Sequence, residues 1–360
     1  MPGLREVREQ LLLAFDENII DEEVFLLLYD VNRSSNPDFD YLSYNLFDFD
    51  VYPEAECYNE LRFKKIDLKR LKNALHIPNE IVCTSYNNIR VDGLEALCIV
   101  LRRLCYPNRF ADLIPRFGRP VPQLSMIFKQ TLDFLILEWD HLLSDLNQTW
   151  LSPERLRFFA DVIHAKGAPL DCVWGFIDGT LKACCRPMRN QRFVYNGHKR
   201  FHGLKYQSVS TPCGLIAHLY GPIEGKRHDS AMLALSGLLD QLQMFSHDQH
   251  GNILCLYGDP AYPMRRHLQA PFGGANLNND EKAFNSAMSK VRVSVEWLFG
   301  DIFTKFKFND FKKNLKIGLS PVGKLYKISA LLTNANTCMY GNLTENYFDI
   351  DPPALEEYFL

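Results

Sequence analysis

VWGFIDGT, residues 173–180, is the stretch that decides the fold of this 360-residue chain. Its first five residues are apolar or small, the pattern of a strand buried on both faces of a sheet. The run then ends on a carboxylate, Asp178, followed at once by a glycine. A second apolar run, NILCLY (252–257), leads in the same way to Asp259. The carboxyl ends of parallel strands meet at one edge of a sheet, where ligands bind, so we expect both aspartates there.

The segment between the two aspartates predicts a β-hairpin. HKRFHGLKYQSVS (198–210) and CGLIAHLYG (213–221) are strand-like and flank the turn signal TPCG. The next segment, SAMLALSGLLDQL (230–242), has a helical pattern. These elements predict an α/β domain with a mixed sheet flanked by helices.

A later segment, FNSAMSKVRVSVEWLFGDIF (284–303), predicts a single helix with one apolar stripe. On the opposite stripe Glu296 follows Arg292 by one turn. If this helix packs on the sheet, Glu296 brings a third carboxylate to the two aspartates.

Carboxylates that share one pocket repel each other unless a cation neutralises them. Mg²⁺ binds carboxylates together with waters and phosphate oxygens. Three acids can hold two such ions ~3.5–4 Å apart, which activates water against a phosphodiester. We therefore predict a site for divalent metal, two Mg²⁺ or Mn²⁺ ions, at Asp178, Asp259 and Glu296. An ordinary turn or cap is the alternative for each acid taken alone.

Charge is segregated along the chain, although the net charge is only −3. Residues 1–60 carry 15 acidic and 3 basic residues, a balance of −12, which leaves +9 for the remainder. No acid lies between Asp178 and Glu224. This arrangement favours contact with a polyanion such as DNA, and a solvated mixed surface is the alternative. The candidate DNA-binding residues are Lys182, Arg186, Arg189, Arg192, Lys199, Arg200, Lys205 and Arg292.

The first 150 residues predict an all-helical region. Within it, VDGLEALCIVLRRLCYP (91–107), a short segment at 108–118 and an apolar helix at 124–143 have a helix-turn-helix-like outline. Asp92 is the expected cap of the first of these helices. Plain packing of three helices is the alternative interpretation.

Several other classes of protein are not indicated. No apolar run approaches the roughly 20 residues of a membrane span, and LLLAF (11–15) does not resemble a signal peptide. With no secretion signal, the ten cysteines are expected to be reduced. GPIEGKRH (221–228) lacks the spacing of a P-loop, and no GxSxG nucleophile elbow occurs.

Five motifs, taken together, resemble the PIF/Harbinger family of DDE transposases, which includes the Harbinger transposase-derived nucleases. They are GFIDGT, YNGHKRFHGLKYQSV, GLIAHLYGPIEGKRHDS, GDPAYP and RVSVEWLFG. The resemblance runs over about residues 90–345. It implies an RNase H-like catalytic fold, with a mixed five-stranded sheet flanked by helices, and DNA cleavage that depends on divalent metal.

The resemblance also implies roles for individual residues. The family's catalytic acids match Asp178, Asp259 and Glu296, and Asp229 in GKRHDS matches an auxiliary acid close to the metal. The implied partners are DNA, a Myb/SANT-like protein and further copies of the chain. The implied location is the nucleus, with the cytoplasm as a second compartment.

We therefore predict four regions and one main function. The regions are an acidic helical segment (1–89), a helix-turn-helix-like region (90–150), the RNase H-like nuclease domain (151–345) and a C-terminal tail (346–360). The predicted function is that of a metal-dependent DNA endonuclease of the transposase type. Two alternatives remain open: a non-catalytic protein that binds DNA or a Myb-like partner, and an unrelated metal phosphoesterase.

Overall fold

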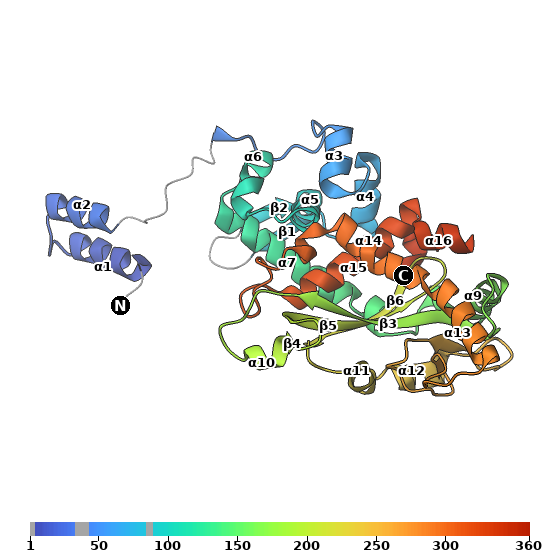
Figure 1. The fold of residues 1–360 in the computed structure, drawn as a ribbon. Helices are drawn as coiled ribbons and strands as arrows, with labels where there is room; N and C mark the ends of the chain where they lie inside the picture. The colour runs from blue at the N-terminus through green and yellow to red at the C-terminus, as the bar shows by residue number, and fades with distance from the viewer. Residues whose placement is uncertain (1–3, 33–42, 84–88) are drawn as a thin grey trace. The chain divides into compact units, whose positions relative to one another are not determined.

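The computed structural model describes residues 4–32, 43–83 and 89–360 (Figure 1). The chain divides into two compact units, Met1–Tyr44 and Asn45–Leu360. The first unit holds α1 (Leu4–Asp16) and α2 (Glu22–Val31). Asp21 caps α2 by accepting a hydrogen bond from the Val24 amide at 2.8 Å, and Phe15 stacks on Phe25. This segment is helical and acidic, as its sequence indicates.

The second unit contains a mixed sheet, which confirms the α/β prediction at this level. Its order is β4-β5-β3-β7-β8, and β6 pairs with β5. The central strand β3 is antiparallel to β5 and parallel to β7. The predicted hairpin is present as β5 and β6. The bounds are β3 Val173–Ala183, β4 Tyr195–Asn196, β5 Phe201–Ser210, β6 Ile216–Glu224, β7 Cys255–Tyr257 and β8 Leu268–Gln269.

Two details of the predicted fold are wrong. The sheet has six strands rather than five, because the two-residue β4 pairs with the start of β5. A strand of two residues is too short to show the alternation of apolar and polar residues by which a strand is predicted from sequence. The N-terminal region is not all-helical, because β1 (Glu80–Cys83) and β2 (Ile89–Asp92) form an antiparallel pair. Each of these two strands buries every second residue, the pattern of a half-buried strand.

Helices cover both faces of the sheet. Figure 1 shows α14 and α15 on one side of it and α11 and α12 on the other. The single helix predicted at 230–242 is interrupted between α11 and α12, where Gly237 has a φ of 67°. The bounds are α8 His141–Ser144, α9 Pro153–Ala165, α10 Gln191–Val194, α11 Asp229–Leu235, α12 Leu238–Phe245, α13 Asn279–Arg292, α14 Ser294–Lys305, α15 Val322–Tyr340, α16 Leu343–Phe348 and α17 Leu355–Tyr358.

The helices that precede the sheet follow the predicted order. Asp92 caps α5 by accepting from the amides of Leu94 and Glu95 at 2.8 and 3.2 Å. Nearly all of α5 is buried, and it packs against α7. The helix-turn-helix interpretation is not confirmed and stays a prediction. The bounds are α3 Glu54–Leu61, α4 Lys65–Ala74, α5 Gly93–Cys105, α6 Ile114–Phe117 and α7 Val121–Trp139.

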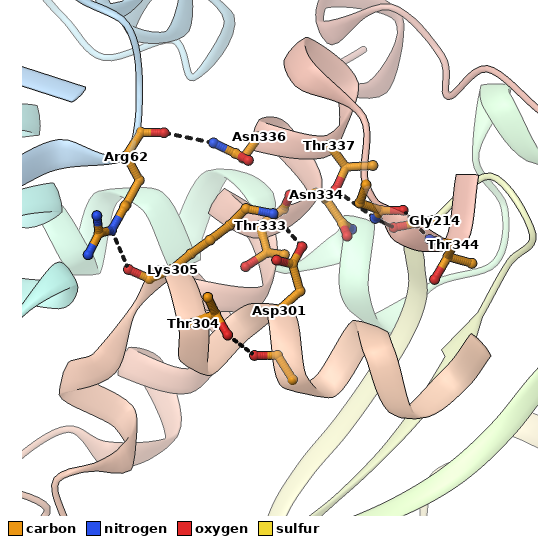
Figure 2. A network of polar contacts seen from close by, with 12 residues as sticks. Arg62, Gly214, Asp301, Thr304, Lys305, Thr333, Asn334, Asn336, Thr337 and Thr344 are labelled. Atoms are coloured by element: carbon orange, nitrogen blue, oxygen red, sulfur yellow. Dashed lines mark hydrogen bonds and ion pairs between the residues drawn. The ribbon is translucent and has the colours of Figure 1, made fainter. Parts of the chain in front are cut away.

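The buried helix α15 makes hydrogen bonds to segments of the second unit that are distant in sequence. Its Asn334 amide accepts from the Ile216 N–H at 2.9 Å and donates to the Ile216 carbonyl at 2.8 Å, as a neighbouring strand would. Two residues later Asn336 donates to the carbonyl of Arg62 at 2.8 Å (Figure 2). The predicted domain boundaries at residues 89, 150 and 345 all fall inside this unit and stay predictions.

Two expectations from composition have structural counterparts. All ten cysteines are free in this structure, and their reduced state in the cell stays a prediction. Along the described part of the chain, no helix combines the length and apolar character needed to cross a membrane.

We expect Asn334→Ala to lower the free energy of unfolding by about 2–4 kcal/mol, because it leaves two buried backbone groups of Ile216 without their partner. Urea unfolding of the full chain measures this change. Asn346→Ala on exposed α16 is the control, with an expected change below about 0.5 kcal/mol. Equal effects of the two substitutions would contradict this role of Asn334.

Candidate active site

The two strand-end aspartates lie at equivalent positions on neighbouring parallel strands. Phe176 of β3 pairs with Tyr257 of β7, and Asp178 and Asp259 each follow two residues later. Along β3 the residues before Asp178 are buried, and exposure begins at Asp178 itself. The structure thus brings Asp178 and Asp259 to the same edge of the sheet.

Asp178 carries its charge in a poorly solvated place, since its side chain is only 20% exposed. Burial first, and then the negative charges of Asp259 and Asp229, raise its pKa to about 6. The guanidinium of Arg292 opposes this shift, because Nη2 donates to Asp178 Oδ1 at 2.9 Å. Asp178 is therefore a carboxylate that requires a neighbouring cation.

The carboxylate of Asp259 is fixed by its own turn. Its Oδ1 accepts from the Ala261 N–H at 3.0 Å, and its carbonyl accepts from the Tyr262 N–H at 3.1 Å. The side chain is half-buried. The first bond orients the carboxylate and the second closes the turn, and neither neutralises the negative charge.

Asp229 lies beside the same strand end and has a cationic partner. Lys205 Nζ is 2.9 Å from Asp229 Oδ1 and also donates to the carbonyl of Arg227 at 3.0 Å. A Cβ on Gly179 would lie 2.1 Å from this Oδ1. A side chain at position 179 would therefore displace the Asp229 carboxylate from its present position.

The structure does not bring Glu296 to the aspartates. The helix predicted to be continuous is interrupted at Val293, between α13 and α14. Thr344 donates a hydrogen bond to the carbonyl of Ser294 just after the break. Helical spacing therefore does not carry over from Arg292, which contacts Asp178, to Glu296.

Glu296 is exposed and lines a separate pocket of about 630 Å³ formed by α14, α15 and α16. Figure 2 shows the polar network beside this pocket, which includes the ion pair between Asp301 and Lys305. Within the described residues no three His, Cys, Asp or Glu side chains are close enough to hold a metal ion. The chemistry of Asp178 and Asp259 fits a divalent cation, whereas this arrangement does not contain the predicted set of three ligands.

Lys182, a candidate DNA contact, lies on β3 inside an aromatic cage. Its amine is 3.5 Å from the ring centroid of Phe303 and 5.7 Å from those of Phe299 and Tyr326. Burial lowers its pKa to about 7. The cation–π contacts fix α14 on the sheet, and they hold the amine away from solvent.

The other candidate DNA contacts divide into two groups. Lys205 and Arg292 are engaged with Asp229 and Asp178. The remaining five are exposed in the segment between β3 and β5, which we call the basic arm (residues 184–200): Arg186, Arg189, Arg192, Lys199 and Arg200.

Sequence reasoning missed Tyr262, which is buried next to the acids. Its hydroxyl is 3.5 Å from the point where a Gly179 side chain would begin. The only signal was its place in GDPAYP, three residues after Asp259.

One comparison with known proteins matches the segment that contains this site. Residues 177–334 match the family model described as DDE superfamily endonuclease. This supports a DDE transposase-like family, and the matched segment contains the acids, the basic arm and Arg292. Searches of curated proteins and of solved structures each found no match to the chain.

Since Asp178 has a higher pKa in the folded chain than when unfolded, folding is favoured by its protonation. The stabilisation is complete below about pH 4 and is lost as the pH rises through about 6, by up to about 3 kcal/mol. Asp178→Asn should abolish this component. Urea unfolding in metal-free buffer from pH 4 to 8 checks it, with exposed Asp240→Asn as the control. Parallel stability curves for the parent chain and Asp178→Asn would refute the shift.

Proposed function

We propose that this chain is a divalent-metal-dependent DNA endonuclease of the PIF/Harbinger transposase type. The observation that carries the proposal is the placement of Asp178 and Asp259 at matched positions on two paired parallel strands. Their mutual repulsion in a partly buried site favours a divalent cation. The match to DDE superfamily endonucleases covers both residues.

Sheet topology supports the finer assignment to an RNase H-like fold. Three antiparallel strands, β6, β5 and β3, continue into the parallel strands β7 and β8. The two aspartates lie at the point where antiparallel pairing changes to parallel pairing.

In this proposal Asp178 and Asp259 hold the divalent ion, and Arg292 holds Asp178 and a DNA phosphate. The bound ion supplies activation of water and neutralisation of the leaving oxygen. Glu296 completes the site as its third acid. Since Glu296 lies in a separate pocket, its role requires a local rearrangement of the first turn of α14 at the break after Val293, while Phe299 and Phe303 farther along α14 keep their contacts with Lys182 of β3.

Asp178→Ala, Asp259→Ala and Glu296→Ala should each slow nicking of supercoiled plasmid in Mg²⁺ or Mn²⁺ by at least about 100-fold, because each removes a carboxylate that stabilises the reacting groups. Asp240→Ala, an exposed acid of α12 within the same matched segment, should nick like the parent.

Nicking by all three alanine variants at the parent rate would exclude the catalytic assignment. Loss in the two aspartate variants alone would restrict the site to Asp178 and Asp259. Activity on a small phosphodiester with no preference for DNA would favour the unrelated phosphoesterase.

DNA binding is assigned to the basic arm. Its five exposed bases have no acid near them in sequence, and Tyr195 is exposed in the same segment. Phosphate contacts from such residues release counterions from DNA. Lys182 and Lys205 are left out of this surface, because their amines are already engaged within the fold.

Arg189→Ala/Arg192→Ala should weaken DNA binding regardless of sequence and reduce the slope of log K against log salt by roughly 1 for each arginine that binds a phosphate. Lys182→Met should leave this slope unchanged. Fluorescence anisotropy of a labelled duplex between 50 and 200 mM salt measures both values. A slope altered by Lys182→Met and not by the arginine variant would reverse the assignment.

A partner-binding role is the second candidate function, and the unit formed by α1 and α2 favours it. α2 has no buried residues. Over residues 4–31 there are eight acidic and two basic residues. An acidic helix pair with uncovered apolar side chains suits a basic partner such as a Myb/SANT-like domain. Its most exposed large apolar side chains are Leu13, Ile19, Leu27 and Val31. Self-association and nuclear location stay predictions.

A further inference from the structure

Tyr262 is a buried phenol with an unused hydroxyl at the edge of the proposed site. The residue is 2% exposed, and its hydroxyl has no hydrogen-bond partner among the residues that the structure describes. Leaving such a group unpaired is unfavourable, because it has lost its hydrogen bonds to water. A function for this hydroxyl is therefore expected from its surroundings.

The ring of Tyr262 packs against the ends of β3 and β7. A Cβ on Gly258 would lie 2.8 Å from Tyr262 Cδ2 and 2.9 Å from Ile177 Cγ2. The ring thus fills the space between the turn that carries Asp259 and the strand that carries Asp178. Glycine at position 258 leaves room for this packing.

The hydroxyl of Tyr262 lies near Asp229 without being hydrogen-bonded to it in this structure. Tyr262 Oη and Asp229 Oδ1 both lie within 3.5 Å of one point, the position of a Cβ on Gly179. Asp229 Oδ1 is paired with Lys205 by charge but has no hydrogen bond of its own in the described part of the molecule. One buried donor and one buried acceptor therefore face the same small space.

The chemistry of the two groups determines the direction of the hydrogen bond. A phenol carries an O–H donor at neutral pH, whereas an ionised carboxylate has acceptor oxygens only. The Tyr262 hydroxyl is therefore the donor, and the Asp229 carboxylate is the acceptor.

We infer that Tyr262, Asp229 and Lys205 form a strut that holds the turn of Asp259 against the end of β3. The Tyr262 hydroxyl donates to Asp229, and Lys205 neutralises Asp229 so that it adds little repulsion to Asp178. Tyr262 and Asp229 are positioning residues for the acid pair. This assigns Asp229 a supporting role rather than that of a metal ligand, and its effect on ion binding rests on the proposed function.

The first experiment is calorimetric titration of the full chain with Mn²⁺. Tyr262→Phe and Asp229→Asn should each weaken binding by about 10-fold, the usual cost of removing a group that orients a ligand. The double variant should bind no more weakly than Asp229→Asn alone, since both changes break one contact. Tyr206→Phe is the matched control, a buried tyrosine with an unpaired hydroxyl away from the aspartates, and should bind like the parent.

Asp178→Asn separates failure of this inference from failure of the proposed function. If neither Asp178→Asn nor Asp259→Asn weakens Mn²⁺ binding, the proposed metal site is wrong. If both weaken it while Tyr262→Phe stays within twofold of the parent, only the strut is wrong. Loss of binding in Asp229→Asn equal to that in Asp178→Asn would make Asp229 a ligand and overturn its supporting role.

Amide hydrogen exchange tests the strut without metal. The Ala261 amide donates to the Asp259 carboxylate and the Tyr262 amide donates to the Asp259 backbone carbonyl, so their exchange reports how firmly the turn of Asp259 is held. Both amides should exchange several-fold faster in Tyr262→Phe and Asp229→Asn, and at the parent rate in Tyr206→Phe. Unchanged exchange in both strut variants would overturn the inference whether or not an ion binds.

Discussion

The burial of one charge, that of Asp178, is the constraint on which the site depends. A carboxylate at the end of an otherwise apolar strand requires a cation, and Arg292 supplies one from the last turn of α13. The nearby acids also require compensation of their negative charge. Asp229 approaches so closely that a side chain at position 179 would displace its carboxylate, and it is paired with Lys205 as its own counter-charge. Each extra negative charge at this edge is thus balanced or oriented by a specific neighbour.

Features that depend on local pattern could be predicted from the sequence. The two apolar runs ending in aspartate, the hairpin at 201–224 and the cap of α5 at Asp92 all follow from residue type and spacing. The pairing of β3 with β7 was expected because both runs are continuously apolar. The sequence could predict that Asp178 and Asp259 lie at one edge of the sheet, because the carboxyl ends of parallel strands meet there.

Features set by tertiary contact could not be predicted in this way. The interruption at Val293 lies within a helical pattern, and a hydrogen bond from distant Thr344 is made at that point. The position of Glu296 depends on this break, so helical spacing placed it wrongly relative to Arg292. Lys182 counted as one more base in a basic run, although three aromatic rings from distant helices surround its amine. A charge count does not distinguish a surface lysine from an enclosed one.

The two halves of the sheet differ in the length of their backbone ladders, and they should therefore differ in local stability. β3 and β5 share a long antiparallel ladder, whereas β7 has three residues and β8 has two. The side that carries Asp259 therefore relies on turn contacts and side-chain packing rather than on a ladder, and regions with few such bonds open first on warming. Asp178 and Asp259 thus belong to segments of different local stability. On warming, the edge that carries Asp259 would then lose its order below the temperature at which the whole chain melts.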